Sequence, residues 1–446
     1  MNAFFATVVI FFVPIYFVAF RRIRGGLFSA NASKIIIIFH MAPIIFGIVA
    51  VAFFNFDLWM GLEKHLTDSM RFTVGFQSIF AIYLMLLFIH LMRHRFRRLD
   101  QAIIIQSDKS GRYRFKKLPF FLVIITLLFY LFELVRLPVI PLIAAITEGP
   151  VAGAVARGYV IEFQINNGLP GLGYVLYFAP IISLVWLYTQ YIAGNVKYLF
   201  WIFAALYFGY NTLFLAKSAF IAPGLMIMWV RYTDKNILFD FKVILSIIAL
   251  IIFMFAFIAF ESPTDLIGQV LKRAFISQTQ GMFLIREFYS TSDINALLYG
   301  LPFKGSLGLE TFDPSVEIIR KLYGKDIDGF VNMNSFFIGQ GFVMLGNAII
   351  ILGPVAYAFN IWVIFTLGPI FKRCTRSGLM RIIQFFFILN LAINTNFALL
   401  LFIRAIVGFI IVSLFFEIVC FLSKAYSRST LERQIKGSRR QSKLVH

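Results

Sequence analysis

Residues 118–136 read LPFFLVIITLLFYLFELVR. No charged residue interrupts this run before Glu133, and the run is long enough for one helical crossing of a bilayer, which needs ~20 apolar residues. The stretch therefore predicts a transmembrane helix. Similar apolar runs recur along most of the chain, so the prediction extends to the class of the whole protein.

The overall composition agrees with a membrane protein built of helices. Of the 446 residues, 60% are hydrophobic and 14% are charged, and 56 are phenylalanine. A soluble domain carries about 25% charged residues, so we expect no soluble domain of any size. The sequence predicts an all-α polytopic bundle of about eleven spans over residues 1–426, followed by a basic tail at 427–446.

The positive charges predict how these spans are oriented. The expected spans lie roughly at residues 2–20, 35–56, 72–92, 118–136, 170–193, 198–215, 217–231, 242–261, 341–371, 380–402 and 405–423. The net charge is +20, and most lysines and arginines flank apolar runs, where positive charge marks the cytoplasmic side. The N-terminus is then outside, and the basic tail, expected to be disordered, is cytoplasmic. No basic face suited to reading bases is evident, so nucleic acid is not an expected partner.

Two loops on the predicted outer side are long enough to form a site, 137–169 and 262–340. The second contains two helix starts, Ser262-Pro263 ahead of 264–277 and Asp313-Pro314 ahead of a piece that ends at Gly324. The apolar residues of 264–277 share one face, which predicts a helix lying in the membrane interface. A lid over a membrane cavity and an ordinary loop packed on the bundle both fit this pattern.

Six cations lie at the outer ends of predicted spans, where positive charge is disfavoured. They are Arg136, Arg157, Lys217, Arg273, Arg286 and Arg404. An arginine near the bilayer centre costs roughly 2.5–3.5 kcal/mol, so such cations need an anionic partner. Carboxylates within the bundle could be these partners and form ion pairs with the cations. The candidates are Glu133, Glu162, Glu261, Glu287 and Glu417. As a group, the cations also suit a diphosphate, which arginine binds through two parallel hydrogen bonds.

Acid–base candidates on the outer side are few. His65 is the one histidine expected to face outward, and Glu162 and Glu287 lie in the two outer loops. Each could take a proton from an acceptor hydroxyl, although a solvated interfacial histidine also explains His65. Asp326 and Asp328 form a tight acidic pair, but the adjacent lysine favours a solvated turn over a metal site. We therefore expect no metal and no cofactor.

The segment RGYVIEFQINNG, residues 157–168, begins with Arg157 and ends with Gly168 after ten intervening residues. It resembles the R-x10-G pattern in outer loops of the Wzy-type O-antigen polymerases. The order of features over residues 118–372 is also similar, with an arginine-bearing outer loop, a small-residue turn at 216–219 and a second long outer loop. Gly168 would let the backbone approach a bound group closely.

The second outer loop departs from that family pattern, because leucine stands eleven residues beyond both Arg273 and Arg286. The resemblance implies a glycosyltransferase that polymerises polyprenyl-diphosphate-linked oligosaccharide repeat units at the periplasmic face of the bacterial inner membrane. A flippase and a chain-length regulator are the protein partners that it implies. The cations would hold the departing diphosphate, and Glu162, Glu287 or His65 would activate the acceptor hydroxyl.

Three other functions stay open on the sequence. An O-antigen ligase would use the same lipid donor and cationic site with a different acceptor. A transporter of polysaccharide or lipid-linked oligosaccharide belongs to another class, and would be favoured by charges midway along spans and by a repeated span pattern, which the sequence does not show. A structural scaffold of the cell envelope would not need clustered outer cations.

Overall fold

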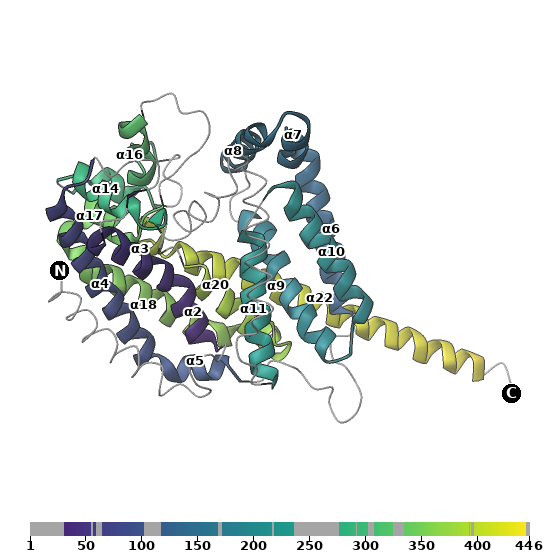
Figure 1. The fold of residues 1–446 in the computed structure, drawn as a ribbon. Coiled ribbons are helices and arrows are strands. Elements are labelled where there is room, and N and C mark those ends of the chain that lie inside the picture. Colours follow the sequence, from purple (N-terminus) through teal and green to yellow (C-terminus); the bar gives the residue numbers. More distant parts are fainter. Residues whose placement is uncertain are drawn as a thin grey trace.

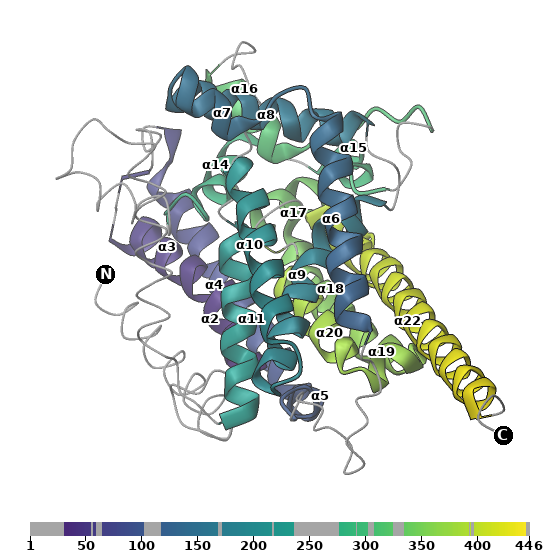
Figure 2. The same cartoon turned by 90° about the vertical axis from the view of Figure 1, so that its right-hand side faces the viewer.

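The computed structural model of the protein is all-helical in the part that it describes, where no strand occurs. That part comprises residues 31–54, 57–58, 65–101, 117–167, 172–215, 218–235, 276–290, 292–301, 307–323, 334–391, 393 and 397–442. Figures 1 and 2 show long helices packed side by side, with shorter helices at both ends of the bundle.

By length and composition, six helical segments of the described residues can cross a membrane. They are Ala32–Phe53 (α2, Ala32–His40, and α3, Ala42–Phe53), α4 (Asp68–Leu91), α6 (Leu118–Arg136), α9 (Leu172–Ile192), Phe337–Ile370 and Arg404–Tyr426. These segments agree with the predicted class of helical membrane protein. The predicted spans 2–20 and 242–261 lie outside the described residues, and the total of about eleven stays a prediction.

The helix α20 (Leu379–Leu389) forms the centre of the bundle. It packs against α2, α9, α11 (Ser218–Lys235), α18 (Ile349–Leu367) and α22 (Arg404–Ser442). Every one of its residues except Arg381 is buried. A helix that is apolar on nearly all sides is stable only where other elements surround it, which explains this central position.

The shorter helices divide between two ends of the bundle (Figure 2). One end carries α7 (Pro141–Thr147), α8 (Pro150–Asn167), α14 (Gln280–Phe288), α15 (Ile294–Leu298) and α16 (Pro314–Tyr323). The opposite end carries α5 (Arg93–Leu99) and α19 (Lys372–Arg376). The predicted outer loop 137–169 is thus a pair of packed helices, because Gly153 of α8 lies against Ala145 of α7. The predicted interfacial helix 264–277 lies almost wholly outside the described residues.

The predicted span 341–371 falls almost wholly in the candidate segment Phe337–Ile370, but this segment is not one straight helix. The short helix α17 (Phe337–Leu345) ends at Gly346, and the chain then reverses through the 3₁₀ turn η3 (Gly346–Ala348) into α18. Gly346 has φ +59° and ψ −146°, a conformation open essentially only to glycine. The reversal brings Phe337 against Gly353, so α17 lies back along the start of α18.

The predicted span 380–402 is also interrupted, because α20 ends at Leu389 and α21 begins only at Phe397 (α21, Phe397–Leu401). The helix α17 forms hydrogen bonds with backbone groups at this break. The Phe337 N–H donates to the carbonyl oxygen of Ile393 at 3.0 Å. The Phe397 N–H donates to Gln340 Oε1 at 2.9 Å. In an apolar bundle, each backbone group without a hydrogen-bond partner costs on the order of several kcal/mol. These two bonds therefore explain how the break is tolerated.

The basic tail is helical instead of disordered as far as Ser442. The helix α22 continues from the bundle through residues 427–442 and projects away from it (Figure 1). Extension of an existing helix avoids the unfavourable nucleation step, and this stretch contains no proline and one glycine, Gly437. The prediction of disorder considered composition alone and omitted that continuity.

Candidate functional site

A cavity of about 340 Å³ lies between α6, α8, α9, α10 (Lys197–Leu213), α11 and the end of α20. Its wall carries four tyrosines from three helices, Tyr130, Tyr177, Tyr207 and Tyr210. The rings of Tyr130 and Tyr210 are stacked, with centroids 3.8 Å apart and an interplanar angle of 5°. The Tyr207 hydroxyl donates to the carbonyl oxygen of Ala219 at 2.8 Å. One side of the cavity is therefore a flat and fixed aromatic surface.

Arg157 of α8 lines this cavity and is half-buried. Its Nη1 donates to the carbonyl oxygen of Leu215 at 3.3 Å, and burial lowers the pKa of the guanidinium. None of the described carboxylates forms an ion pair with it. Leu215 has φ +52°, a left-handed conformation that costs a non-glycine residue about 1–3 kcal/mol. Since a guanidinium has five N–H donors, Arg157 retains capacity to bind an anion.

Two amides add polar groups to the same cavity. Asn211 Nδ2 donates to the carbonyl oxygen of Tyr207 at 2.8 Å, and Asn390 Nδ2 donates to that of Phe386 at 2.8 Å. Each amide thus uses a donor on its own helix. The side-chain oxygens are acceptors, which suit the hydroxyl groups of a polar ligand.

Glu133 is a buried carboxylate one helical turn from Tyr130 on α6. It lies close enough to Tyr177 and Tyr210 to interact with both electrostatically. Sequence reasoning treated Glu133 only as an ion-pair partner and did not single out the four tyrosines. A signal was present, because Tyr207 and Tyr210 are three residues apart in one apolar run, as are Tyr130 and Glu133, and such pairs share a helix face.

Two further predicted cations lie at the same end of the bundle. Arg136 ends α6, with its Cζ 5.0 Å from the ring centroid of Phe132. Arg404 begins α22 and donates from Nε to the Tyr174 hydroxyl at 2.9 Å. Tyr174 precedes Tyr177 by one helical turn of α9, which places Arg404 about one turn from the cavity.

Three other predicted site residues, Arg286, Glu287 and His65, form a separate group at α14. Arg286 is buried, with its Cζ 3.4 Å from the ring centroid of Phe342, and burial lowers its pKa to about 10. Its Nη1 donates to Asn347 Oδ1 at 3.5 Å. Glu287 accepts from Thr67 Oγ1 at 3.0 Å. The His65 ring centroid is 5.9 Å from that of Phe288.

None of these α14-group residues lines the cavity that contains Arg157. The structure therefore does not bring Arg286 together with Arg157. Lys217, Arg273, Gly168, Asp326 and Asp328 lie outside the described residues, and Glu162 belongs to α8 without a described side chain. Within the described residues, no cluster of three or more histidine, cysteine, aspartate or glutamate side chains could hold a metal ion.

Comparison of the chain with protein-family models, curated proteins and solved structures found no match. The described residues form an all-helical fold with six segments that can span a membrane and an arginine- and tyrosine-lined cavity beside α8. Its function is inferred from these residues and their geometry.

Proposed function

We propose that the protein is a glycosyltransferase that polymerises polyprenyl-diphosphate-linked oligosaccharide repeat units at the periplasmic face of the bacterial inner membrane. The observation that carries the proposal is the half-buried Arg157, which has no ion pair to the described side chains and lies on a tyrosine-lined cavity. A diphosphate satisfies such a guanidinium, and aromatic faces suit sugar rings. The similarity of residues 157–168 to the O-antigen polymerase pattern supports the same assignment.

The proposed reaction transfers a glycosyl group from the lipid diphosphate. The acceptor hydroxyl oxygen attacks the anomeric carbon, the bond from that carbon to the diphosphate oxygen breaks, and its electron pair leaves with the diphosphate. Arg157 and Arg404 stabilise the developing charge. Glu162, Glu287 and His65 are the candidate bases for the hydroxyl proton, and Glu162 is the one carried by the same helix as Arg157.

A transporter of lipid-linked oligosaccharide is the second candidate, and the interrupted helix α20–α21 favours it. Substrate sites of secondary transporters are typically built at broken helices, and Asn390 at this break lines the cavity. An O-antigen ligase would share the donor site and differ only in the acceptor.

Deletion of the gene followed by gel analysis of surface polysaccharide separates these functions. Single capped repeat units are expected for a polymerase. Loss of all capping would indicate a ligase, and loss of outward-facing lipid-linked units would indicate a transporter. Either of the last two results would refute polymerisation.

We propose a topology of about eleven spans with the N-terminus outside and the C-terminus in the cytoplasm. Single cysteines at the exposed positions Ile146 and Leu307 should react with a membrane-impermeant thiol reagent in intact cells, whereas a cysteine at Lys372 should be shielded. The native Cys374 and Cys420 are buried, which keeps the background low. All three positions should react after permeabilisation, and the reverse pattern in intact cells would invert the topology.

We expect the purified enzyme to retain activity in excess EDTA. Arginines already neutralise the diphosphate, and carboxylate ligands of a metal would oppose their field. Exchange of both Asp326 and Asp328 for asparagine should change the rate by less than about tenfold, or ~1.4 kcal/mol in barrier. The measurement is the initial rate of chain growth on lipid-linked repeat units. Activity that disappears with chelator and returns with Mg²⁺ would contradict this expectation.

A further inference from the structure

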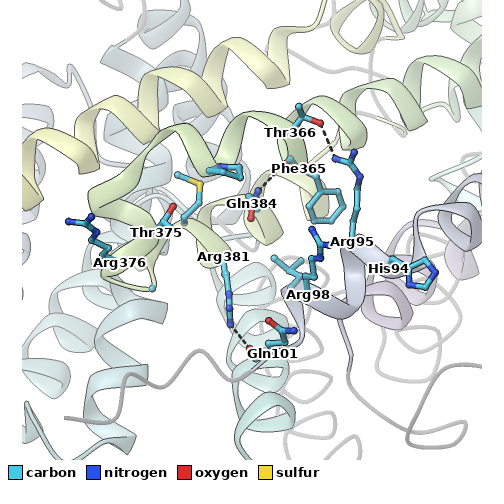
Figure 3. Close-up of a pocket in the computed structure, with 14 residues that line it drawn as sticks. His94, Arg95, Arg98, Gln101, Phe365, Thr366, Thr375, Arg376, Arg381 and Gln384 are labelled. Atoms are coloured by element: carbon cyan, nitrogen blue, oxygen red, sulfur yellow. Dashed lines mark hydrogen bonds between the residues drawn. The ribbon is translucent and has the colours of Figure 1, made fainter. Parts of the chain in front are cut away.

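A second cavity, of about 890 Å³, lies at the opposite end of the bundle, between α5, α19, the start of α20 and the end of α18. Four arginines line it, Arg95 and Arg98 from α5, Arg376 from α19 and Arg381 from α20 (Figure 3). None of the described residues that line it is acidic. Its chemistry is therefore that of an anion site.

Two of these arginines are held in place by hydrogen bonds. Arg95 Nη1 donates to Thr366 Oγ1 at 2.9 Å, and Arg381 Nη1 donates to the carbonyl oxygen of Gln101 at 2.8 Å (Figure 3). Gln384, which is buried in the wall, donates from Nε2 to the carbonyl oxygen of Ile364 at 3.1 Å. Arg98 and Arg376 are exposed at the cavity. The cationic lining thus combines two hydrogen-bonded arginines with two exposed ones.

Like charges gathered in one cavity repel each other, so four guanidinium groups with no carboxylate among the described lining residues favour a bound anion. Guanidinium groups match the geometry of phosphate oxygens, with two parallel hydrogen bonds from each fork. A phosphate ester or diester is the chemical class that fits best.

The neighbouring surface indicates that this phosphate belongs to a lipid. One face of α18 is exposed and apolar from Val355 through Phe359 and Trp362, and it reaches Thr366 at the cavity. Arg95 lies where that face meets the cavity, with its Cζ 5.8 Å from the ring centroid of Trp362. A ligand with a phosphate head in the cavity and an apolar chain along α18 would use both surfaces.

We propose that this cavity binds the headgroup of an anionic phospholipid whose acyl chains lie along the exposed face of α18. Basic pockets between membrane helices bind such headgroups, and the cytoplasmic leaflet is rich in anionic lipid. The α5/α19 end carries the loops that the sequence assigns to the cytoplasm, so lipid and site would be on the same side. The proposal does not depend on glycosyl transfer at the other end.

The test is native mass spectrometry of the full chain in a neutral detergent, with equimolar phosphatidylglycerol and phosphatidylcholine of identical chains. The wild-type protein should retain phosphatidylglycerol in preference to phosphatidylcholine. The double variant Arg98→Gln/Arg376→Gln should lower that preference about tenfold or more, since two charge-assisted contacts are lost. The matched control Arg97→Gln/Lys372→Gln removes two charges from the same helices without altering the lining. It should change the preference for phosphatidylglycerol by less than about threefold.

Equal retention of phosphatidylglycerol by both double variants would overturn the proposal, because the lipid would then bind through general surface charge. A second arm measures the midpoint of thermal unfolding with phosphatidylglycerol and with inorganic phosphate at the same ionic strength. We expect stabilisation by the lipid that Arg98→Gln/Arg376→Gln abolishes. Equal stabilisation by inorganic phosphate, lost in the same variant, would overturn the lipid assignment and identify a site for a soluble phosphate.

Discussion

We expect Arg157→Ala to abolish polymer formation while leaving the protein folded and inserted in the membrane. Among the described residues that line the tyrosine-lined cavity, Arg157 is the one that carries a charge. Under the proposed function, its loss would leave the departing diphosphate without that donor. Loss of one preorganised donor to a developing anion costs about 10²–10³ in rate, or roughly 2.7–4 kcal/mol. Arg157→Lys retains the charge and loses the paired donors, so its rate should lie between those of the wild type and the alanine variant.

The measurement is the initial rate with purified protein and lipid-linked repeat units, together with the chain-length distribution on gels. Arg320→Ala is the matched control, because Arg320 lies at the same end of the bundle on α16 and pairs with Glu317 at the surface at 3.6 Å. The control should stay within about twofold of the wild-type rate, as expected for loss of a surface ion pair. Wild-type chain lengths in cells carrying Arg157→Ala would refute a role of Arg157 in diphosphate binding.

We expect Gly339→Ala to destabilise the fold more than most single substitutions do. A Cβ at Gly339 would overlap the backbone of Met282 in α14, and backbone atoms cannot move aside as a flexible side chain can. Overpacking of this kind costs about 1–3 kcal/mol, and here it also separates α17 from α14. The midpoint of thermal unfolding of the detergent-solubilised protein should fall clearly below that of the wild type.

Gly209→Ala provides the comparison for that measurement. Gly209 lies within α10, and a Cβ added there meets no atom within 4 Å. Alanine is the better helix former by about 1 kcal/mol, so this variant should be as stable as the wild type or slightly more so. Equal unfolding midpoints for the two variants would show that the α14–α17 contact is not close-packed in solution.

Much of the bundle is predictable because apolar length dominates the signal. The predicted span 118–136 coincides with α6, whose run is bounded by Lys117 and Arg136. The predicted helix start at Asp313-Pro314 coincides with the start of α16, where Asp313 Oδ1 accepts from the Ser315 N–H at 2.9 Å. Both features depend only on residues that are close in the sequence, so the sequence alone predicts them.

The reversal at Gly346 and the break after Leu389 were not predicted, because a count of apolar residues does not distinguish a straight span from one that folds back. Gln340 was a visible polar residue near the first of these, but its partner Phe397 lies 57 residues away. Such pairings depend on tertiary contacts that the sequence pattern does not contain.

The candidate sites also contain residues that the sequence predicts and residues whose role depends on tertiary contacts. Arg157 was found because a cation at an outer span end is unusual. The tyrosines of its cavity were not, because the chain has 18 tyrosines and 56 phenylalanines. The three-residue spacing of Tyr207 and Tyr210 indicates a shared helix face, but it does not show that this face lines a cavity. Arg95, Arg98 and Arg381 were interpreted only as orientation signals, since the sequence does not reveal that their two loops meet.

The fold-back of α17 has a consequence for the order in which the protein assembles in the membrane. Its nine residues are too few to cross a bilayer, and the chain segments that complete its hydrogen bonds, Ile393 and Phe397, are synthesised later. The α17 segment therefore leaves the ribosome before its final neighbours exist. The hydrogen bonds of α17 to Ile393 and Phe397 can therefore form only after the chain has been made as far as α21.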